Sequence, residues 1–317
     1  MLVRELIEGQ EIDQVLLVRA RARREEGGQL RLTLGDRTGT LGATVSEEIG
    51  GCCEPGDVVR VAGRYELSAR GAEVRVRELR PATEQEYTLD TLIDGPPRSA
   101  DGMEADLREL IATIQDRHLQ ALLDAVLGPG SDTWRRFREA PAAKRYHQAY
   151  RHGLLEHSLT VAQAVSAISA TFGGIDRDVA VTGALLHDIG KLEAYTADPL
   201  AIDMTDLGKL QGEIPLGYYR VRRLIEDLPG FPQELAVAVL HIILSHHGSL
   251  EHGSPVVPCT REAWLVHMID NLGGKLGSFD RLEKGLAPGS AWTGFDRGVG
   301  ASAYFGPLTA QPERRAA

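Results

Sequence analysis

The chain has 317 residues, of which 43% are hydrophobic and 25% charged, and its formal net charge is −10. This is the composition of an ordinary soluble globular protein, and the length suffices for two domains. The longest apolar stretch, residues 235–244, is interrupted by His241, so no membrane-spanning helix is expected. The amino terminus lacks the pattern of a secretory signal, and the three cysteines form no Cys-x-x-Cys pair. We therefore expect a cytoplasmic protein with no membrane partner and no thiolate metal site.

Residues 1–82 show the period-two alternation of β-strands. Leu30, Leu32 and Leu34, for example, fall on one face of a strand. The five expected strands cover residues 14–23, 29–36, 40–45, 58–65 and 72–79. Five short strands separated by turns predict a small closed barrel such as the OB-fold. The segments LRLTLGDRTGTLGATV and GDVVRVAGRYEL also resemble the OB-fold family that includes tRNA-anticodon-binding domains.

The remainder of the chain has a different pattern. Residues 83–102 are polar and contain Gly95-Pro-Pro97, which predicts a linker. Across residues 103–286, apolar side chains recur at spacings of three and four, as in amphipathic helices. Residues 287–317 are rich in Gly, Ala and Pro, which predicts a loosely held tail. The expected fold class is a multidomain α+β protein, with an OB-type barrel followed by an all-helical domain.

Histidine and aspartate residues interrupt several apolar helical segments. His187 and Asp188 end the apolar run 179–186, and a charged pair inside a helical core is costly unless something compensates it. A bound dication would compensate both residues, whereas a simple His–Asp hydrogen bond is the alternative for this pair alone. The same residue types recur on three further helical segments, at His157, at His246-His247 and at Asp270. We expect these groups, each near the end of a different helix, to converge inside a bundle.

The order His … His-Asp … His-His … Asp resembles the HD superfamily of metal-dependent phosphohydrolases. The surrounding segments are APAAKRYHQAYRHGLLEHSLTVA, GALLHDIGKLEAY, TDLGKLQGEIPLG and HIILSHHGSLEHGSPVVPCTREAWLVHMIDNLGGKL. They resemble the YhaM-type 3′-to-5′ exoribonucleases, which join an N-terminal OB-fold to a C-terminal HD domain. This resemblance, over residues 10–285, implies release of 5′-mononucleotides from the 3′ end of single-stranded nucleic acid, with RNA favoured over DNA. It also implies manganese- or cobalt-type dications, with iron, nickel and zinc as further candidates.

The resemblance implies two metals with Asp188 as their shared ligand. Lys191, one helical turn later, is expected to contact the phosphate as a point charge, and a solvated lysine is the alternative. Asp188 and Lys191 are thus the candidate catalytic residues. The implied ligands are His157, His187, Asp188 and Asp270 for one metal, and Asp188, Glu213, His246 and His247 for the other. Two such metals would supply an activated water, charge neutralisation and a stabilised leaving oxygen.

Two positions depart from the family pattern. Glu213 follows Gly212 where the family usually has a histidine that binds the second metal. A glutamate favours harder ions such as Mn²⁺ over Zn²⁺; a weaker second site, a one-metal enzyme and a surface glutamate are the alternatives. In HQAY, where relatives more often have two histidines, only His147 is left. It is expected either near the substrate phosphate or packed against the helix.

The barrel is poor in aromatic residues for a domain that binds single strands. Such domains stack bases on aromatic rings, but Tyr65 is the only aromatic residue among residues 1–86. The first 82 residues hold thirteen arginines, no lysine and fourteen acidic residues, so this part is close to neutral. The candidates for contact with the nucleic-acid backbone are Arg19, Arg21, Arg23 and Arg24. A solvated arginine face and a role in homo-oligomer assembly are the alternatives.

Three other functions share parts of this pattern. A nucleotide phosphohydrolase would use every ligand but would leave the barrel without a role. A cyclic-nucleotide phosphodiesterase shares His-Asp-Ile-Gly-Lys, but residues 248–254 lack the Gly-Tyr-Pro signature of that branch. A non-catalytic RNA-binding protein is disfavoured by the intact ligand set. The sequence leaves open the native metal, the choice between RNA and DNA, and the number of subunits.

Overall fold

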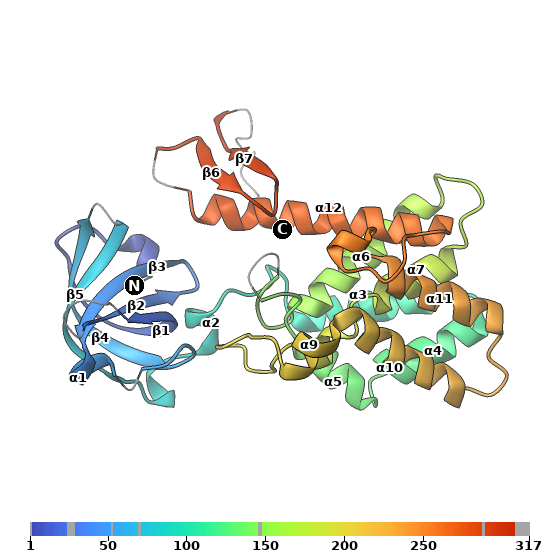
Figure 1. Ribbon diagram of the computed structural model, residues 1–317, viewed down its shortest axis with the longest axis horizontal. Helices are drawn as coiled ribbons and strands as arrows, with labels where there is room; N and C mark the ends of the chain where they lie inside the picture. The colour runs from blue at the N-terminus through green and yellow to red at the C-terminus, as the bar shows by residue number, and fades with distance from the viewer. Residues whose placement is uncertain are drawn as a thin grey trace. The chain divides into compact units, whose positions relative to one another are not determined.

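The computed structural model describes residues 2–23, 29–51, 53–68, 71–144, 148–286 and 289–307. The chain divides into two compact units (Figure 1). The first comprises Met1–Gly95 with Asp198–Ile202, and the second comprises Pro96–Ala197 with Asp203–Ala317. Among the described residues, no helix is both long enough and apolar enough to cross a membrane.

The first unit is a closed barrel with the strand order β1-β2-β3-β5-β4. Its strands are β1 (Glu11–Arg23), β2 (Gln29–Asp36), β3 (Gly39–Ser46), β4 (Val58–Ser68) and β5 (Gly71–Pro81). The pair β3–β5 is parallel, and the other neighbouring strands are antiparallel. All five expected strands are confirmed, and the closed five-stranded barrel fits the predicted OB-type fold.

Alternation along the strands fills the barrel interior. Leu30, Leu32 and Leu34 are at most 1% exposed, as their shared face of β2 predicts. Closing the sheet requires bends, and the register of β4 with β5 shifts between Ala62 and Gly63. A Cβ at Gly63 would lie 2.3 Å from the carbonyl oxygen of Arg75, so only glycine fits at this bulge.

Short helical segments flank the barrel. They are η1 (Val3–Glu5), α1 (Glu47–Gly50), η2 (Glu84–Glu86) and α2 (Leu89–Leu92). The last two lie in the predicted linker 83–102, where Leu92 and Ile93 are buried against Leu17 and Val58. The linker prediction is therefore wrong for this half of the segment, because an apolar pair within the polar run gives it a packing partner on the barrel.

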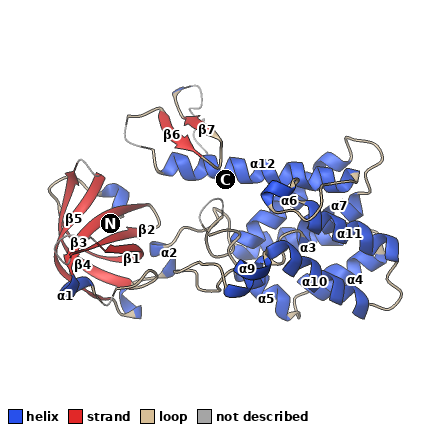
Figure 2. Cartoon of the chain, in the orientation of Figure 1, coloured by secondary structure: helices blue, strands red, loops and turns tan. Residues whose placement is uncertain are grey.

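The second unit is a bundle of helices (Figure 2). Its helices are α3 (Ala100–Ala112), α4 (Arg117–Leu127), α5 (Asp132–Glu139), α6 (Gly153–Ser169), α7 (Arg177–Leu186), α8 (Lys191–Ala194), α9 (Asp206–Gln211), α10 (Glu213–Asp227), α11 (Gln233–Ser245), η3 (Leu250–His252) and α12 (Arg261–Lys284). Side-chain caps set several helix starts: Ser99, Ser131 and Asp176 accept backbone N–H groups at α3, α5 and α7. The predicted all-helical domain is confirmed.

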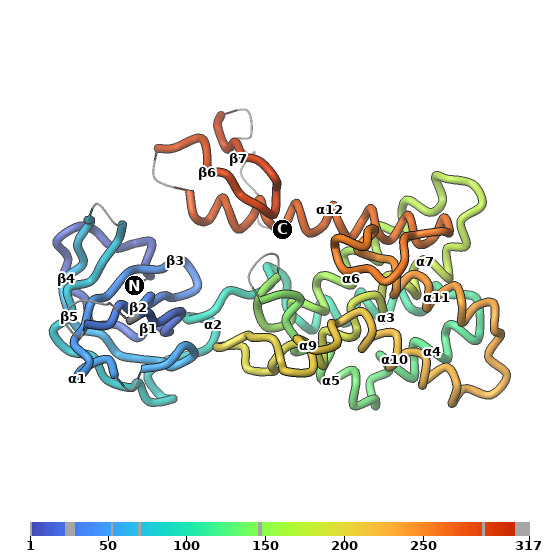
Figure 3. The backbone as a smooth tube through the Cα atoms, in the orientation of Figure 1, coloured from blue at the N-terminus to red at the C-terminus, as the bar shows by residue number. Residues whose placement is uncertain are grey.

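Helix α7 forms the centre of this bundle. All its residues from Val179 to Leu186 are buried, which explains why the sequence shows an uninterrupted apolar run there. The helix packs against α6, α11 and α12 (Figure 3). A Cβ at Gly183 would lie 2.4 Å from Ile242 of α11, so this glycine permits the close approach of the two helices. The ends of α7 and α11 are thereby brought to the same region of the core.

The end of the chain is more ordered than expected. Strands β6 (Trp292–Asp296) and β7 (Ala301–Tyr304) form an antiparallel hairpin. Arg281 of α12 is ion-paired with Asp296 at 2.7 Å, and the rings of Phe279 and Phe305 meet edge to face. The predicted loose tail is thus wrong for this hairpin, because its aromatic and acidic residues have partners on α12. Residues 308–317 lie outside the described part of the chain.

Candidate metal centre

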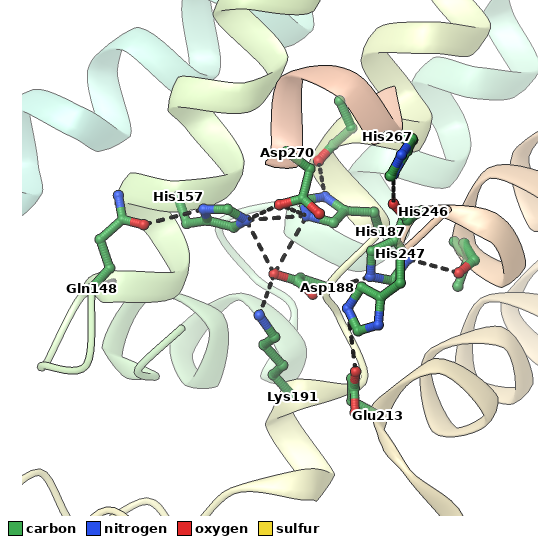
Figure 4. Close-up of polar contacts among 12 residues, drawn as sticks. Gln148, His157, His187, Asp188, Lys191, Glu213, His246, His247, His267 and Asp270 are labelled. Carbon is green, nitrogen blue, oxygen red and sulfur yellow. Dashed lines mark hydrogen bonds and ion pairs between the residues drawn. The ribbon is translucent and has the colours of Figure 1, made fainter. Parts of the chain in front are cut away.

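Three helical elements bring the first group of predicted ligands together (Figure 4). His157 lies on α6, His187 directly follows α7, and Asp270 lies in the middle of α12 rather than near its end. Nε2 of His157 lies 3.2 Å from Nε2 of His187 and 3.0 Å from Oδ1 of Asp270. The ligand atoms of these three residues all lie within 4.8 Å of one another and could together hold a metal ion.

In Figure 4, Asp188 approaches the imidazoles of His157 and His187 from the side opposite Asp270. Its Oδ2 lies 3.3 Å from Nε2 of His157 and 3.4 Å from Nε2 of His187. Atoms that bind one ion at about 2.1 Å lie about 3.0–3.4 Å apart in tetrahedral or octahedral sites. The distances from Oδ2 of Asp188 and Nε2 of His157 to the neighbouring ligand atoms are therefore those expected of ligands to one small cation.

The other oxygen of Asp188 faces a second group. Its Oδ1 lies 3.6 Å from Nε2 of His246, and Nε2 of His247 lies 3.5 Å from Oε1 of Glu213. Oδ1 of Asp188 and Nε2 of His246 are buried, and neither has a hydrogen-bond partner in the part of the chain that the structure describes. Leaving two such atoms unsatisfied is costly, whereas a cation between them would satisfy both. The residues present therefore fit the binding of divalent metal, with Asp188 between the two groups.

Hydrogen bonds to backbone carbonyls orient three of the imidazoles. Nδ1 of His187 lies 2.7 Å from the carbonyl oxygen of Ala184, and Nδ1 of His246 lies 2.8 Å from that of Ile243. Nδ1 of His247 lies 2.9 Å from the carbonyl oxygen of His252. Because a carbonyl only accepts, each Nδ1 carries the proton, and each Nε2 presents its lone pair when the ring is neutral.

The centre concentrates negative charge in a buried place. Burial alone would raise the pKa of Asp188, but Lys191 and His187 hold this pKa well below its usual range. Burial likewise opposes ionisation of Asp270, whose pKa is held well below its usual range by His157 and His187. Burial would lower the pKa of His187, but Asp188 and Asp270 raise it to about 10. The carboxylates thus require nearby positive charge, which protons supply when no dication is bound.

Two glycines allow the ligand-bearing segments to approach one another. A Cβ at Gly190 would lie 1.9 Å from the carbonyl oxygen of Glu213, so only glycine admits the start of α10 beside the turn after Asp188. Gly248 has φ +81°, and a Cβ there would lie 2.1 Å from the ring of His267.

His267 contacts the backbone of a proposed ligand. Its Nδ1 lies 2.7 Å from the carbonyl oxygen of His246. The sequence reasoning did not single out His267, although its position three residues before Asp270 was an available signal.

The structure shows other contacts for the remaining candidates. Nζ of Lys191 lies 2.6 Å from Oδ2 of Asp188, so this buried lysine is ion-paired rather than solvated, and its contact with a phosphate stays a prediction. Arg19 donates to the carbonyl oxygens of Asp36 and Leu92, and Arg21 is ion-paired with Glu54. Three candidates cannot be placed: His147 and Arg24 lie outside the described residues, as does the side chain of Arg23.

The proposed ligands differ in their exposure to solvent, and each of the two groups contains both buried and partly exposed side chains. The side chains of His157, His187, Asp188 and His246 are 0–2% exposed. Those of Asp270, Glu213 and His247 are 16%, 22% and 28% exposed. These last three residues are therefore the part of the centre that solvent can reach.

Comparisons with known proteins agree with this arrangement. Residues 154–274 match the HD domain family. The chain is 28% identical over 290 residues to the 3′-5′ exoribonuclease YhaM of Bacillus subtilis (strain 168), with 89% of this chain and 90% of the relative covered. It is 29% identical over 288 residues to the 3′-5′ exoribonuclease YhaM of Geobacillus sp. (strain WCH70), with 89% and 87% covered.

A match to a solved structure, asparaginyl-tRNA synthetase from Pyrococcus horikoshii complexed with asparaginyl-adenylate, is weaker. It covers 40% of this chain and 32% of that chain at 18% identity, and its TM-score of 0.23 is too low to carry an argument. The two relatives and the match to the HD domain family are therefore the comparisons that bear on this chain. The helical unit after the barrel thus contains the residues that match the HD domain family, and the resemblance of the chain to the YhaM-type proteins is confirmed over most of its length.

Proposed function

We propose that the protein is a metal-dependent 3′-to-5′ exonuclease that hydrolyses single-stranded RNA to 5′-mononucleotides. The observation that carries this proposal is the convergence of the ligand groups on Asp188, whose two oxygens face different imidazole groups. The polarity and the RNA substrate are taken from the names of the two relatives, which are similar to this chain along nearly all of their length. HD-type nucleotide phosphohydrolases would share the ligands, but the barrel supports a polymeric substrate.

Divalent metals, when bound, would neutralise phosphate charge and lower the pKa of an attacking water. The residues would supply the rest. His157, His187 and Asp270 would hold one ion with Asp188, and Glu213, His246 and His247 would hold the other. The exposed edges of Asp270, Glu213 and His247 would leave room for a phosphodiester on the open side of the centre. Lys191 would keep Asp188 ionised and fixed in place by their buried ion pair.

The donor set favours Mn²⁺ or Co²⁺ as the native ions. Imidazole nitrogens suit many transition metals, but carboxylate oxygens from Asp188, Asp270 and Glu213 favour harder ions over zinc. An all-cysteine or His-Cys site would have favoured zinc, and the centre holds no thiol among its described residues.

The barrel would bind the RNA backbone rather than stack its bases. Tyr65 is 8% exposed and belongs to the barrel core, so it offers no ring to a base. Arg19 and Arg21 have protein partners, whereas Arg24 and the side chain of Arg23 lie outside the described residues, so all four arginines stay candidates for phosphate contact. A cytoplasmic location and assembly into homo-oligomers stay predictions.

Degradation of end-labelled RNA tests the proposal. The full chain is incubated with the same single-stranded RNA labelled at either the 3′ or the 5′ end, with Mn²⁺ or with EDTA. We expect the 3′ label to be released at once as a mononucleotide, the 5′-labelled RNA to shorten gradually, and EDTA to stop both. Release of the 5′ label first would reverse the assigned polarity. Hydrolysis of free nucleotides with intact RNA would favour a nucleotide phosphohydrolase.

A further inference from the structure

The imidazole of His157 is oriented differently from the other three. His187, His246 and His247 each use Nδ1 to donate to a backbone carbonyl, whose position is set by the fold. Nδ1 of His157 instead lies 3.1 Å from Oε1 of the Gln148 side chain, and Figure 4 shows this amide oxygen directed at the ring. At Nδ1, His157 thus faces a side chain, whereas the other three imidazoles face backbone carbonyls.

The backbone holds Gln148 in an uncommon conformation. Its φ is +51°, in the left-handed region that non-glycine residues rarely adopt. The carbonyl oxygen of Gln148 accepts a hydrogen bond from the backbone N–H of Ala142 at 3.1 Å. A Cβ at Gly153 would lie 2.0 Å from the same oxygen, so the start of α6 is packed tightly against this residue. Costly backbone conformations are kept where the surrounding structure fixes them, and here they direct the amide at His157.

The oxygen of the Gln148 amide lies 3.1 Å from Nδ1 of His157. Because an amide oxygen only accepts, Nδ1 of His157 donates to it and carries the proton. This leaves Nε2 of His157 facing the first ligand group.

We propose that Gln148 is a positioning residue for the metal centre: its amide oxygen keeps the proton of His157 on Nδ1 and directs Nε2 at the first metal. This inference rests on the proposed metal site. It adds a residue that lies outside the proposed ligand set. Partners of this kind typically change metal affinity 10- to 100-fold when they are removed.

The test measures metal affinity in the full chain by titration calorimetry with Mn²⁺ and with Co²⁺. Gln148→Met keeps the length of the side chain and removes the acceptor, and it should weaken binding at one of the sites by about 10- to 100-fold. Gln148→Glu keeps an acceptor beside Nδ1 of His157, and it should retain most of the parental affinity.

The matched control is Gln163→Met, which removes an exposed amide from α6, the helix that carries His157. The control and all variants should unfold at similar urea concentrations in EDTA, which separates positioning from a general loss of structure. Equal Mn²⁺ affinity for Gln148→Met and the parent would overturn the proposal, as would a Gln148→Glu variant that binds metal no better than Gln148→Met. A parent chain that binds no metal would instead refute the proposed function.

Discussion

Replacing Asp188 with asparagine tests both the fold and the chemistry of the centre. The substitution keeps the size of the side chain but leaves the ammonium group of Lys191, 2.6 Å away, without its counter-charge. The Lys191 side chain is only 10% exposed, so water offers little compensation. Removing one partner of a buried ion pair costs about 3–5 kcal/mol, whereas removing both charges is often neutral. We therefore expect Asp188→Asn to lower the free energy of unfolding by about 3 kcal/mol and Asp188→Asn, Lys191→Met to restore most of it.

The two variants separate stability from catalysis. Urea unfolding in EDTA gives the free energies, and release of a 3′ label from RNA with Mn²⁺ gives the activity. Both variants should lose activity by orders of magnitude, because neither offers a charged ligand common to the two imidazole groups. Near-parental turnover by the stable double variant would refute the shared-ligand arrangement. Equal unfolding free energies for the parent and Asp188→Asn would show that Lys191 does not depend on this carboxylate.

Substitutions at three further positions test other contacts of the chain. Glu213→Ala should remove one bound metal per chain while the site around His157 stays filled. Glu213→His should shift the metal preference from Mn²⁺ towards softer ions. If both variants bind as many metal ions per chain as the parent does, Glu213 is not a ligand. Gly190→Ala should cost about 1–3 kcal/mol in urea unfolding, because the new methyl group would displace the start of α10, and should weaken one metal more than the other. Arg19→Ala should lower the free energy of unfolding by about 1 kcal/mol, because two carbonyl groups lose their donor. The KM for long RNA should change little. A raised KM with parental stability would instead make Arg19 a contact for nucleic acid.

Periodic patterns in the sequence predicted two kinds of element: those with one buried face and those buried on all sides. The alternation of Leu30, Leu32 and Leu34 indicates a strand with one buried face, and the structure buries all three. The apolar run that ends at His187 indicates a central helix, and α7 is buried along nearly its whole length. Histidine and aspartate, which can bind metals, stand out at the ends of such segments because either residue needs a partner when it is buried. This is why most of the centre could be found without the structure.

Contacts between distant segments could not be found in this way. Leu92-Ile93 and the β6–β7 hairpin are short, and their partners on the barrel and on α12 are unknown until the chain is folded. Gln148 gives no periodic signal, because its role depends on a left-handed backbone and on the position of His157 nine residues later. Arg19 is a further example: the sequence shows a run of charge, and only the fold shows that this arginine donates to carbonyl groups.

Two positions at which the sequence departs from the expected family pattern lie beside different ligand groups. Gln148 and Glu213 both stand where that pattern leads us to expect a histidine. The oxygen of Gln148 faces His157 in the first group, and that of Glu213 faces His247 in the second group. Because the two groups share only Asp188, changes at these positions should alter the affinities of the two metals separately, and any coupling between them would have to pass through that carboxylate.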